Sequence, residues 1–342
     1  MKESLAVKYR PKTWSEVTEQ SSVRIILEQQ ITSGNICHSL LFIGSAGCGK
    51  TTCARIYANE VNQGKGNPIE LDAASNNGVD DVRSIIAQAQ TKSLDSEYKV
   101  FVIDECHALS SQGWQAFLKL IEEPPAKSIF IFCTTNPEKI PKTILSRVQQ
   151  YTFKKISQQG IVDRLRYICD REIVGENGIV RLEALEYIAR IAEGGLRDAL
   201  TLLDKCMAYS PELTLENVVK TLGTVDYDTM ISLTDNYLAD DSKEVVKIIN
   251  SVNDDGKDMK QFLKSYTYFL MDVIKYLKGC DWKYLTIPKL NTYESFFSQI
   301  EDNEYDLLFN LMKACVRLNS EIKYSAVPKL DIEAMFLIQM GG

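Results

Sequence analysis

The chain has 342 residues, enough for two or three domains, and its 45% hydrophobic and 25% charged residues are typical of a globular protein. The net charge of −7 argues against a surface that binds nucleic acid everywhere, although it is compatible with a local basic groove. No apolar run approaches the roughly 20 residues needed to cross a bilayer, and the N-terminal segment lacks a signal-peptide core. We therefore expect a cytoplasmic protein with no membrane partner.

The nine cysteines occur singly, mostly in apolar runs, without a CxxC pair or a second nearby ligand. Zinc sites need clustered ligands, so we expect no zinc, and in a reducing compartment we expect no disulfides. The two histidines, His38 and His107, have no partners at metal-binding spacing. We interpret both as packing or hydrogen-bonding residues.

The first half of the chain alternates short apolar runs with helical patterns. Continuous apolar runs suit strands buried on both faces of a parallel sheet. We predict strands at residues 39–45, 69–73, 99–106 and 128–135, with helices at 51–61, 79–90 and around Trp114–Ile121. This alternation predicts a doubly wound α/β domain over residues 1–156.

After Phe153 the strand patterns stop and helical ones continue. Apolar stripes at 162–169 and 184–191 predict a small helical domain over residues 157–222. Long amphipathic stretches, such as 259–277 and 305–318, predict an all-α domain over residues 223–342.

One segment matches the phosphate-binding pattern G-x-x-x-x-G-K-[ST], between a predicted strand and a predicted helix. In this pattern the backbone N–H groups surround the phosphates, the lysine reaches the outer phosphates and the threonine hydroxyl binds Mg²⁺. The predicted nucleotide-binding residues here are Gly44, Ala46, Gly47, Cys48, Gly49, Lys50, Thr51 and Thr52.

Polar residues follow two further predicted strands. Asp104 ends the strand 99–106 and could complete a Mg²⁺ site with Thr51, while Glu105 could polarise an attacking water. Thr135 ends the predicted strand 128–135 and could reach the γ-phosphate or the water. Spacing alone leaves Arg147 and Arg197 open, because a lone arginine near a helix end is usually a solvated or capping residue.

These motifs belong to a longer series of matches. Residues 8–14, 44–51, 70–79, 103–110, 118–125, 134–137, 144–147 and 195–200 resemble, in family order, the clamp-loader ATPases of the AAA+ class. The pattern is most similar to the bacterial DNA polymerase III gamma/tau subunit. The resemblance implies a five-stranded parallel sheet flanked by helices, a helical lid and an all-α collar.

The resemblance also implies roles for individual residues. It implies an ATP hydrolase with Mg²⁺, in which Thr135 is the first γ-phosphate sensor and Arg197, from the lid, is the second. Arg147 would be an arginine finger directed at the neighbouring subunit. Tyr9, Arg10 and Pro11 would close over the adenine. The implied partners are other loader subunits in a ring-like, pentameric assembly, a sliding clamp and primer-template DNA.

The sequence departs from the family pattern in three respects. Residues 61–68 lie where bacterial members usually carry a four-cysteine zinc module. The family's SRC triplet is Ser146-Arg147-Val148 here. The chain also ends after the third domain, without the long tau-type extension. These differences suggest a compact version, and a viral origin is one interpretation of them.

A loader must act on DNA of any sequence, so we expect phosphate contacts from helix N-termini. The candidates are Ser75, Asn76, Asn77, Gly78, Ser110 and Ser111, which could equally be helix caps. Two other functions remain open. One is another AAA+ ATPase that acts on DNA, such as a branch-migration motor or helicase loader. The other is a non-hydrolysing scaffold subunit, against which the intact Lys50, Asp104 and Glu105 argue.

Overall fold

The computed structural model describes residues 3–341 with the exception of residues 77, 92, 94, 174–178, 223–226 and 288–290. The chain forms two compact units, Met1–Thr214 and Leu215–Gly342, which we describe separately. Within the described residues, no helix is long and apolar enough to span a membrane.

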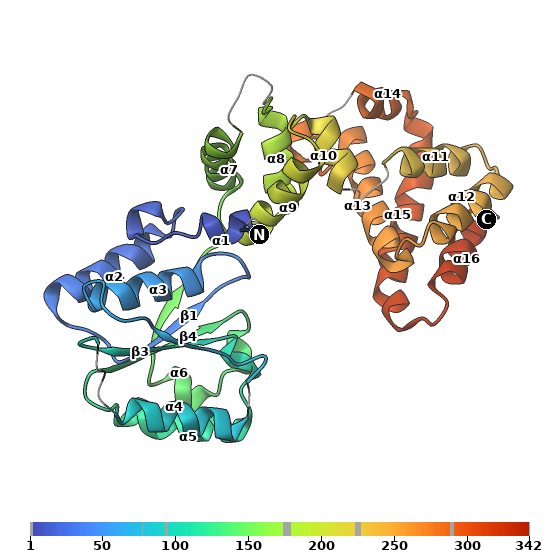
Figure 1. Cartoon of the computed structure of the whole chain (residues 1–342). Helices are drawn as coiled ribbons and strands as arrows, with labels where there is room; N and C mark the ends of the chain where they lie inside the picture. The colour runs from blue at the N-terminus through green and yellow to red at the C-terminus, as the bar shows by residue number, and fades with distance from the viewer. Residues whose placement is uncertain are drawn as a thin grey trace. The chain divides into compact units, whose positions relative to one another are not determined.

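The first unit contains a five-stranded parallel sheet, which confirms the predicted fold class (Figure 1). Its strand order is β2-β3-β4-β1-β5. The central strands are apolar on both faces and almost fully buried, as expected for a parallel sheet. The strands are β1 (Ser39–Ile43), β2 (Ile69–Asp72), β3 (Lys99–Asp104), β4 (Ser128–Thr134) and β5 (Gln149–Thr152).

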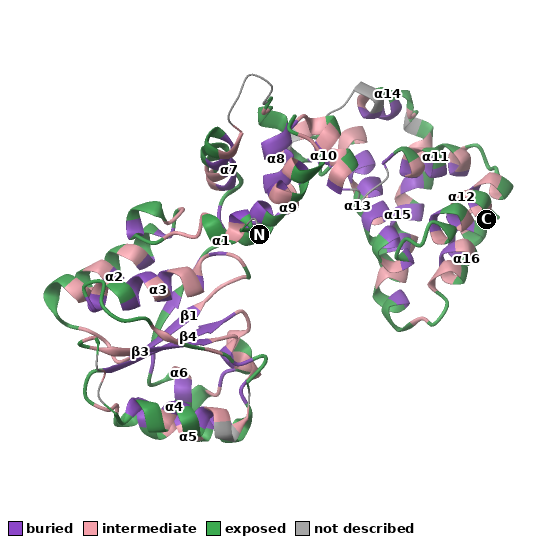
Figure 2. Ribbon diagram, in the orientation of Figure 1, coloured by how far each residue is buried: buried purple, intermediate pink, exposed green. Residues whose placement is uncertain are grey.

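Helices cover both faces of the sheet, and the purple buried residues concentrate in the strands and on the helix faces that meet them (Figures 1 and 2). Alternate residues of β1, β3 and β4 belong to the two cores on opposite sides of the sheet. Leu40 and Phe42 of β1 pack toward α2 and α3, whereas Leu41 packs toward α4, α5 and α6. The helices are α2 (Ser21–Ser33), α3 (Lys50–Val61), α4 (Val79–Ala89), α5 (Ser111–Glu122) and α6 (Lys142–Leu145).

Two features of the sheet were not found from the sequence. The fifth strand, β5, has only Tyr151 buried, so it lacks the apolar run that located the other strands. The sequence also did not indicate the strand order, in which β4 lies between β3, which ends at Asp104, and β1, which precedes the P-loop. Strand order depends on long-range pairing, which local patterns do not encode.

The lid follows the sheet in the same unit. It consists of α7 (Gln158–Glu172), α8 (Leu182–Ile191) and α9 (Leu196–Tyr209), and the N-terminal helix α1 (Leu5–Lys8) packs on α9. Ser157 caps α7, because its Oγ accepts the Gly160 N–H at 3.0 Å.

The second unit is helical throughout its described residues. It comprises α10 (Leu215–Leu222), α11 (Tyr227–Leu238), α12 (Ser242–Asp254), α13 (Met259–Leu277), α14 (Asn291–Gln299), α15 (Tyr305–Glu321) and α16 (Pro328–Met340). Short 3-10 turns in the chain are η1 (Trp14–Glu16), η2 (Cys106–Ala108), η3 (Pro137–Lys139), η4 (Trp282–Tyr284), η5 (Asp302–Glu304) and η6 (Ile322–Tyr324). The two units divide after Thr214, whereas the sequence predicts that the small helical domain extends to residue 222. The predicted boundary concerns functional domains and stays a prediction.

A buried carboxylate organises part of the second unit. Asp272 of α13 is fully buried, and its Oδ2 accepts the N–H groups of Thr286 at 2.6 Å and Ile287 at 2.8 Å. It also accepts the Thr286 hydroxyl, and its Oδ1 accepts Lys275 Nζ at 3.3 Å. The side chain therefore holds the segment after α13 against the helix.

We expect Asp272→Ala to destabilise the second unit by about 3 kcal/mol, because it leaves buried donors unpaired. Native-state hydrogen exchange of the α13 amides in the full chain measures this loss. Asp306→Ala, at an exposed position of α15, is the control and should change stability by less than about 0.5 kcal/mol. Equal protection of α13 in both variants would contradict the assigned role.

Candidate functional site

The loop between β1 and α3 has the backbone conformation that its glycines predict. Gly47 and Gly49 have φ angles of +69° and +105°, in the left-handed region that side chains disfavour. A Cβ on Gly44 would lie 2.7 Å from the carbonyl oxygen of Phe153, so that position also requires glycine. The loop is therefore fixed in a curved conformation at the carboxyl end of β1.

Lys50 begins α3 and lies over this loop. Its side chain is buried, and Nζ donates to the carbonyl oxygens of Gly44 and Ser45, both at 2.9 Å. A buried ammonium needs such partners, because an unpaired buried charge is costly. The positive charge is thereby held at the mouth of the loop.

A hydrogen bond joins the P-loop to the third strand of the chain. Thr51 Oγ1 donates to Asp104 Oδ2 at 2.7 Å, and the N–H of Glu105 donates to Asp104 Oδ1 at 3.0 Å. A hydroxyl and a carboxylate are hard oxygen ligands of the kind that Mg²⁺ prefers. In the described ranges, no group of three or more histidine, cysteine, aspartate or glutamate side chains is placed to hold a metal ion.

Glu105 adopts an uncommon backbone conformation, with φ at +46°. Its Oε2 accepts the Thr135 hydroxyl at 3.1 Å and lies 3.2 Å from His107 Nδ1. The same His107 nitrogen lies 3.2 Å from Thr134 Oγ1. The fold thus brings together two predicted site residues, Glu105 and Thr135, because β4 ends beside β3.

The sequence predicts that His107 is a packing or hydrogen-bonding residue. It is within hydrogen-bonding distance of Thr134 and Glu105, so its partners lie at the site, which its spacing does not predict. The available signal was its position two residues after Glu105, in a 3-10 turn that returns the ring to the strand end.

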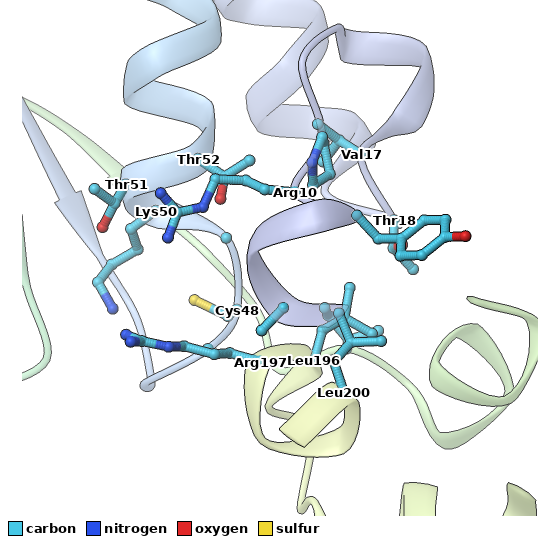
Figure 3. Close-up of a pocket in the computed structure, with 16 residues that line it drawn as sticks. Arg10, Val17, Thr18, Cys48, Lys50, Thr51, Thr52, Leu196, Arg197 and Leu200 are labelled. Carbon is cyan, nitrogen blue, oxygen red and sulfur yellow. The ribbon is translucent and has the colours of Figure 1, made fainter. Parts of the chain in front are cut away.

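A cavity of about 130 Å³, the P-loop pocket, lies between the P-loop, the N-terminal segment and the lid (Figure 3). Figure 3 shows Arg10, Lys50 and Arg197 extending toward the same side of this pocket from three separate segments. It is lined by Ala6, Tyr9, Arg10, Pro11, Val17, Thr18, Gly47, Cys48, Gly49, Lys50, Thr51, Thr52, Ile156, Leu196, Arg197 and Leu200.

The lid contacts the P-loop directly. The N–H of Leu196 donates to the Gly47 carbonyl at 3.1 Å, and a Cβ on Gly47 would lie 3.1 Å from the Cα of Gly195. Arg197, the next residue, is the second residue of α9 and lines the pocket. Its position relative to the P-loop is therefore set by backbone contact.

The positive charges around the pocket disfavour one another. Burial, followed by the charges of Arg55 and Arg197, lowers the pKa of Arg10 from its usual value. An anion in the pocket would raise the pKa of Arg10 again. Its negative charge would compensate for the hydration that the guanidinium loses on burial and for the repulsion by the other arginines. The pocket is therefore electrostatically suited to phosphate.

The predicted adenine-side residues Tyr9, Arg10 and Pro11 all line the pocket. Tyr9 is tied to the lid, since its hydroxyl donates to Glu172 Oε1 at 2.5 Å and its carbonyl accepts Arg164 at 2.9 Å. The apolar lining residues were not found from the sequence, because isolated apolar residues carry no motif; they are Val17, Ile156, Leu196 and Leu200.

Comparisons with known proteins agree with this geometry. Residues 67–157 match the family model described as DNA polymerase III, delta subunit. Residues 160–212 match the model for the DNA polymerase III clamp loader subunit, ATPase lid domain. The DNA polymerase III subunit tau of Bacillus subtilis is 32% identical over 95% of this chain and 61% of its own length. The subunit tau of Escherichia coli is 34% identical over 76% of this chain and 43% of its own length.

Over these matched residues the chain is similar to the clamp-loader subunits of DNA polymerase III. The resemblance inferred from the sequence is thereby confirmed. The chain spans 61% of the Bacillus relative and less than half of the Escherichia relative. Similarity extends to plants, where Protein STICHEL-like 1 of Arabidopsis thaliana is 33% identical over 99% of this chain and 32% of its own.

A solved structure supports the fold described above. Thermotoga maritima RuvB has a TM-score of 0.53 and 19% identity, over 75% of this chain and 90% of the RuvB chain. At this identity the likeness concerns the AAA+ fold alone.

The arginine that the family pattern assigns as a finger lies elsewhere. Among the described residues the P-loop pocket is lined by Arg10 and Arg197, but not by Arg147. Arg147 follows α6, is 41% exposed and donates from Nε to Glu122 at 2.7 Å. Its other donors bond the Thr143 carbonyl and the Ser146 hydroxyl.

The candidate DNA contacts lie at two helix starts. Ser110 caps α5 by accepting the Gly113 N–H at 3.1 Å, and the exposed Ser111 is the first residue of the helix. Gly78 precedes α4 and donates to Asp81 at 3.2 Å. Exposed Ser75 and Asn76 bond to Asp72, and Asn77 lies outside the described residues.

We expect Lys50→Ala to abolish measurable nucleotide binding, because the pocket loses the charge held at the P-loop. Calorimetric titration of Mg²⁺·ATP into each variant measures the affinity. Lys65→Ala, at an exposed loop position, is the matched control and should bind as the unchanged chain does. Unaltered affinity in Lys50→Ala would exclude the P-loop as the nucleotide site.

Proposed function

We propose that this protein is the ATPase subunit of a DNA sliding-clamp loader. The observation that carries the proposal is the Thr51–Asp104 hydrogen bond, which joins the P-loop to the strand end beside Glu105. This arrangement occurs in a chain whose residues 160–212 match a clamp-loader ATPase lid.

The proposed cofactors are ATP and Mg²⁺, with no zinc. The curved glycine loop, the buried Lys50 ammonium and the crowded charge of Arg10 fit a polyphosphate. The oxygens of Thr51 and Asp104 fit a hard divalent cation. When bound, the metal would neutralise charge on the phosphates.

Hydrolysis requires an ordered nucleophile and stabilisation of developing charge. Glu105 would orient and polarise the attacking water, since its carboxylate lies at the strand end next to Asp104. Thr135, bonded to that carboxylate, would respond to the γ-phosphate, and Arg197 would bring positive charge from the lid. Tyr9, Arg10 and Pro11 would contact the base and sugar side.

The position of Arg147 supports a role between subunits. Its exposed guanidinium lies outside the residues that line its own pocket. We propose that it reaches the ATP site of a neighbouring subunit in a ring-like, pentameric assembly. In this assembly the second unit of each chain, Leu215–Gly342, would act as part of the collar. An arginine supplied in trans would make hydrolysis depend on subunit contact.

In this scheme ATP binding opens the clamp and grips primer-template DNA, and hydrolysis releases the closed clamp on DNA. The proposed DNA contacts are to phosphates, from Ser75, Asn76, Asn77 and Gly78 before α4 and from Ser110 and Ser111 before α5. The helix N-termini have donors suited to phosphate. We expect the assembly to act in the cytoplasm, on nucleoid DNA.

The decisive experiment compares ATP turnover with sliding clamp plus primed DNA against turnover with each alone. A clamp loader is stimulated most by the two together. Stimulation by branched DNA without a clamp would instead favour a branch-migration motor, whose fold is similar. An assembly that binds clamp but shows no turnover would favour a non-hydrolysing scaffold.

Glu105→Gln should preserve Mg²⁺·ATP binding and stop turnover, because it keeps the side-chain shape and removes the charge that polarises water. We expect turnover to fall by about 10²-fold or more. Single-turnover hydrolysis measures the chemical step, and a titration confirms binding. Turnover near that of the unchanged chain would show that another group is the catalytic carboxylate.

Arg147→Ala should leave nucleotide binding intact and lower hydrolysis in the neighbouring site by about 10³-fold or more. A mixture of Arg147→Ala and Lys50→Ala subunits should recover part of the activity, because some interfaces pair an intact P-loop with an intact finger. Tagged pull-down verifies mixed assembly. Arg166→Ala, an exposed lid arginine, is the control. Verified mixed assemblies at background activity would exclude a finger in trans.

A further inference from the structure

Two consecutive residues before α2 have left-handed backbone conformations. Glu19 has a φ of +58° and Gln20 a φ of +56°. Residues with side chains adopt this region uncommonly, at a cost of about 1–3 kcal/mol each, and do so where surrounding contacts hold them. The contacts of these two side chains therefore indicate what the conformation achieves.

Gln20 is buried and bridges to the strand-to-lid connection. Its Oε1 accepts the N–H of Lys154 at 3.1 Å, and its Nε2 donates to the Lys154 carbonyl at 2.6 Å. The same Nε2 lies 3.4 Å from the carbonyl oxygen of Cys48 in the P-loop. One amide thus contacts both the P-loop and the hinge segment, residues 153–157, that links β5 to α7.

Glu19 holds the other end of the hinge segment. Its Oε2 accepts the N–H of Ser157 at 3.1 Å, and its Oε1 accepts the Ser157 hydroxyl. A Cβ on Gly160 would lie 2.6 Å from Glu19 Oε1, so the first turn of α7 closely approaches this carboxylate. Glu19 is therefore tied to the residue that caps the first lid helix.

The hinge segment also contacts the turn between α8 and α9 of the lid. The N–H of Ile156 donates to the Gly194 carbonyl at 3.2 Å, and a Cβ on Gly194 would lie 2.7 Å from the Cβ of Lys155. Arg197 follows three residues later and lines the P-loop pocket. A continuous set of contacts therefore runs from Gln20 through the hinge segment to Arg197.

We propose that Glu19 and Gln20 are positioning residues that set the angle of the lid, so that Arg197 is held at the P-loop pocket. Neither residue lines that pocket among its described lining residues. They act through the hinge segment, by fixing its backbone relative to the P-loop. The effect on nucleotide rests on the proposed function, whereas the effect on the hinge does not.

The first test uses no nucleotide. Gln20→Asn retains an amide and a residue type that tolerates left-handed backbone, but its side chain is one methylene shorter. We expect the Lys154 amide to exchange with deuterium about tenfold faster, because a buried hydrogen bond is lost. Glu19→Ala should do the same for the Ser157 amide.

The control for the first test is Gln30→Ala. Gln30 lies in the same helix region and also bonds across to the sheet, through Gln149 at 2.8 Å and Tyr151 at 2.9 Å. Neither partner belongs to the hinge segment, so hydrogen exchange of the Lys154 and Ser157 amides should stay unchanged in Gln30→Ala. Circular dichroism confirms that each variant is folded. Unchanged exchange at Lys154 in folded Gln20→Asn would overturn the proposal.

The second test asks whether the hinge acts through Arg197. When Arg197 is present, Gln20→Asn should weaken the binding of a fluorescent ATP analogue about five- to tenfold. In a chain that already carries Arg197→Ala, adding Gln20→Asn should weaken this binding less than twofold. Equal losses in both backgrounds would show that Gln20 does not position Arg197. Failure of the unchanged chain to bind the analogue would contradict the proposed function and leave the exchange result standing.

Discussion

The hydrogen bond between Thr51 and Asp104 is the contact on which the site depends. It joins the start of α3 to the end of β3, although β4 lies between β3 and β1, the strand that precedes α3. The geometry is possible because parallel strands end at one edge of the sheet, where the following loops meet. Once Asp104 is fixed, the backbone of Glu105 is fixed by its own bond to that carboxylate. The neighbouring end of β4 then supplies Thr135 to Glu105.

A second constraint is that several positive side chains line the P-loop pocket and no negative side chain lines it with them among the described residues. Lys50, Arg10 and Arg197 line one pocket that includes no aspartate or glutamate among the residues described as lining it. The groups that accept from Lys50 are neutral backbone carbonyls of Gly44 and Ser45. Such an arrangement costs stability in the protein alone, and an anionic ligand would recover this cost. The lid contributes one of these charges, so ligand binding and lid position are thermodynamically coupled.

The sequence predicted the features that depend on local pattern. The P-loop and the buried strands β1, β3 and β4 have signals contained within about ten residues. Strand β5 was not predicted from a local pattern because only Tyr151 of its four residues is buried. The contacts of His107 and Gln20 were not predicted for a different reason. Their partners, Thr134 and Lys154, lie 27 and 134 residues away, so no local window contains both members of the pair.

The contrast between Arg197 and Arg147 bears on how the proposed ring would respond to assembly. Arg197 is placed by backbone contact between the lid and Gly47, so its approach to the pocket is built into one chain. Arg147 is placed by an exposed ion pair with Glu122. Pairs of this kind contribute only about 0–1 kcal/mol, since water and salt screen them. The guanidinium can therefore leave Glu122 for a phosphate at little cost. Catalysis that requires both arginines would then be limited by subunit contact rather than by breaking the Glu122 pair.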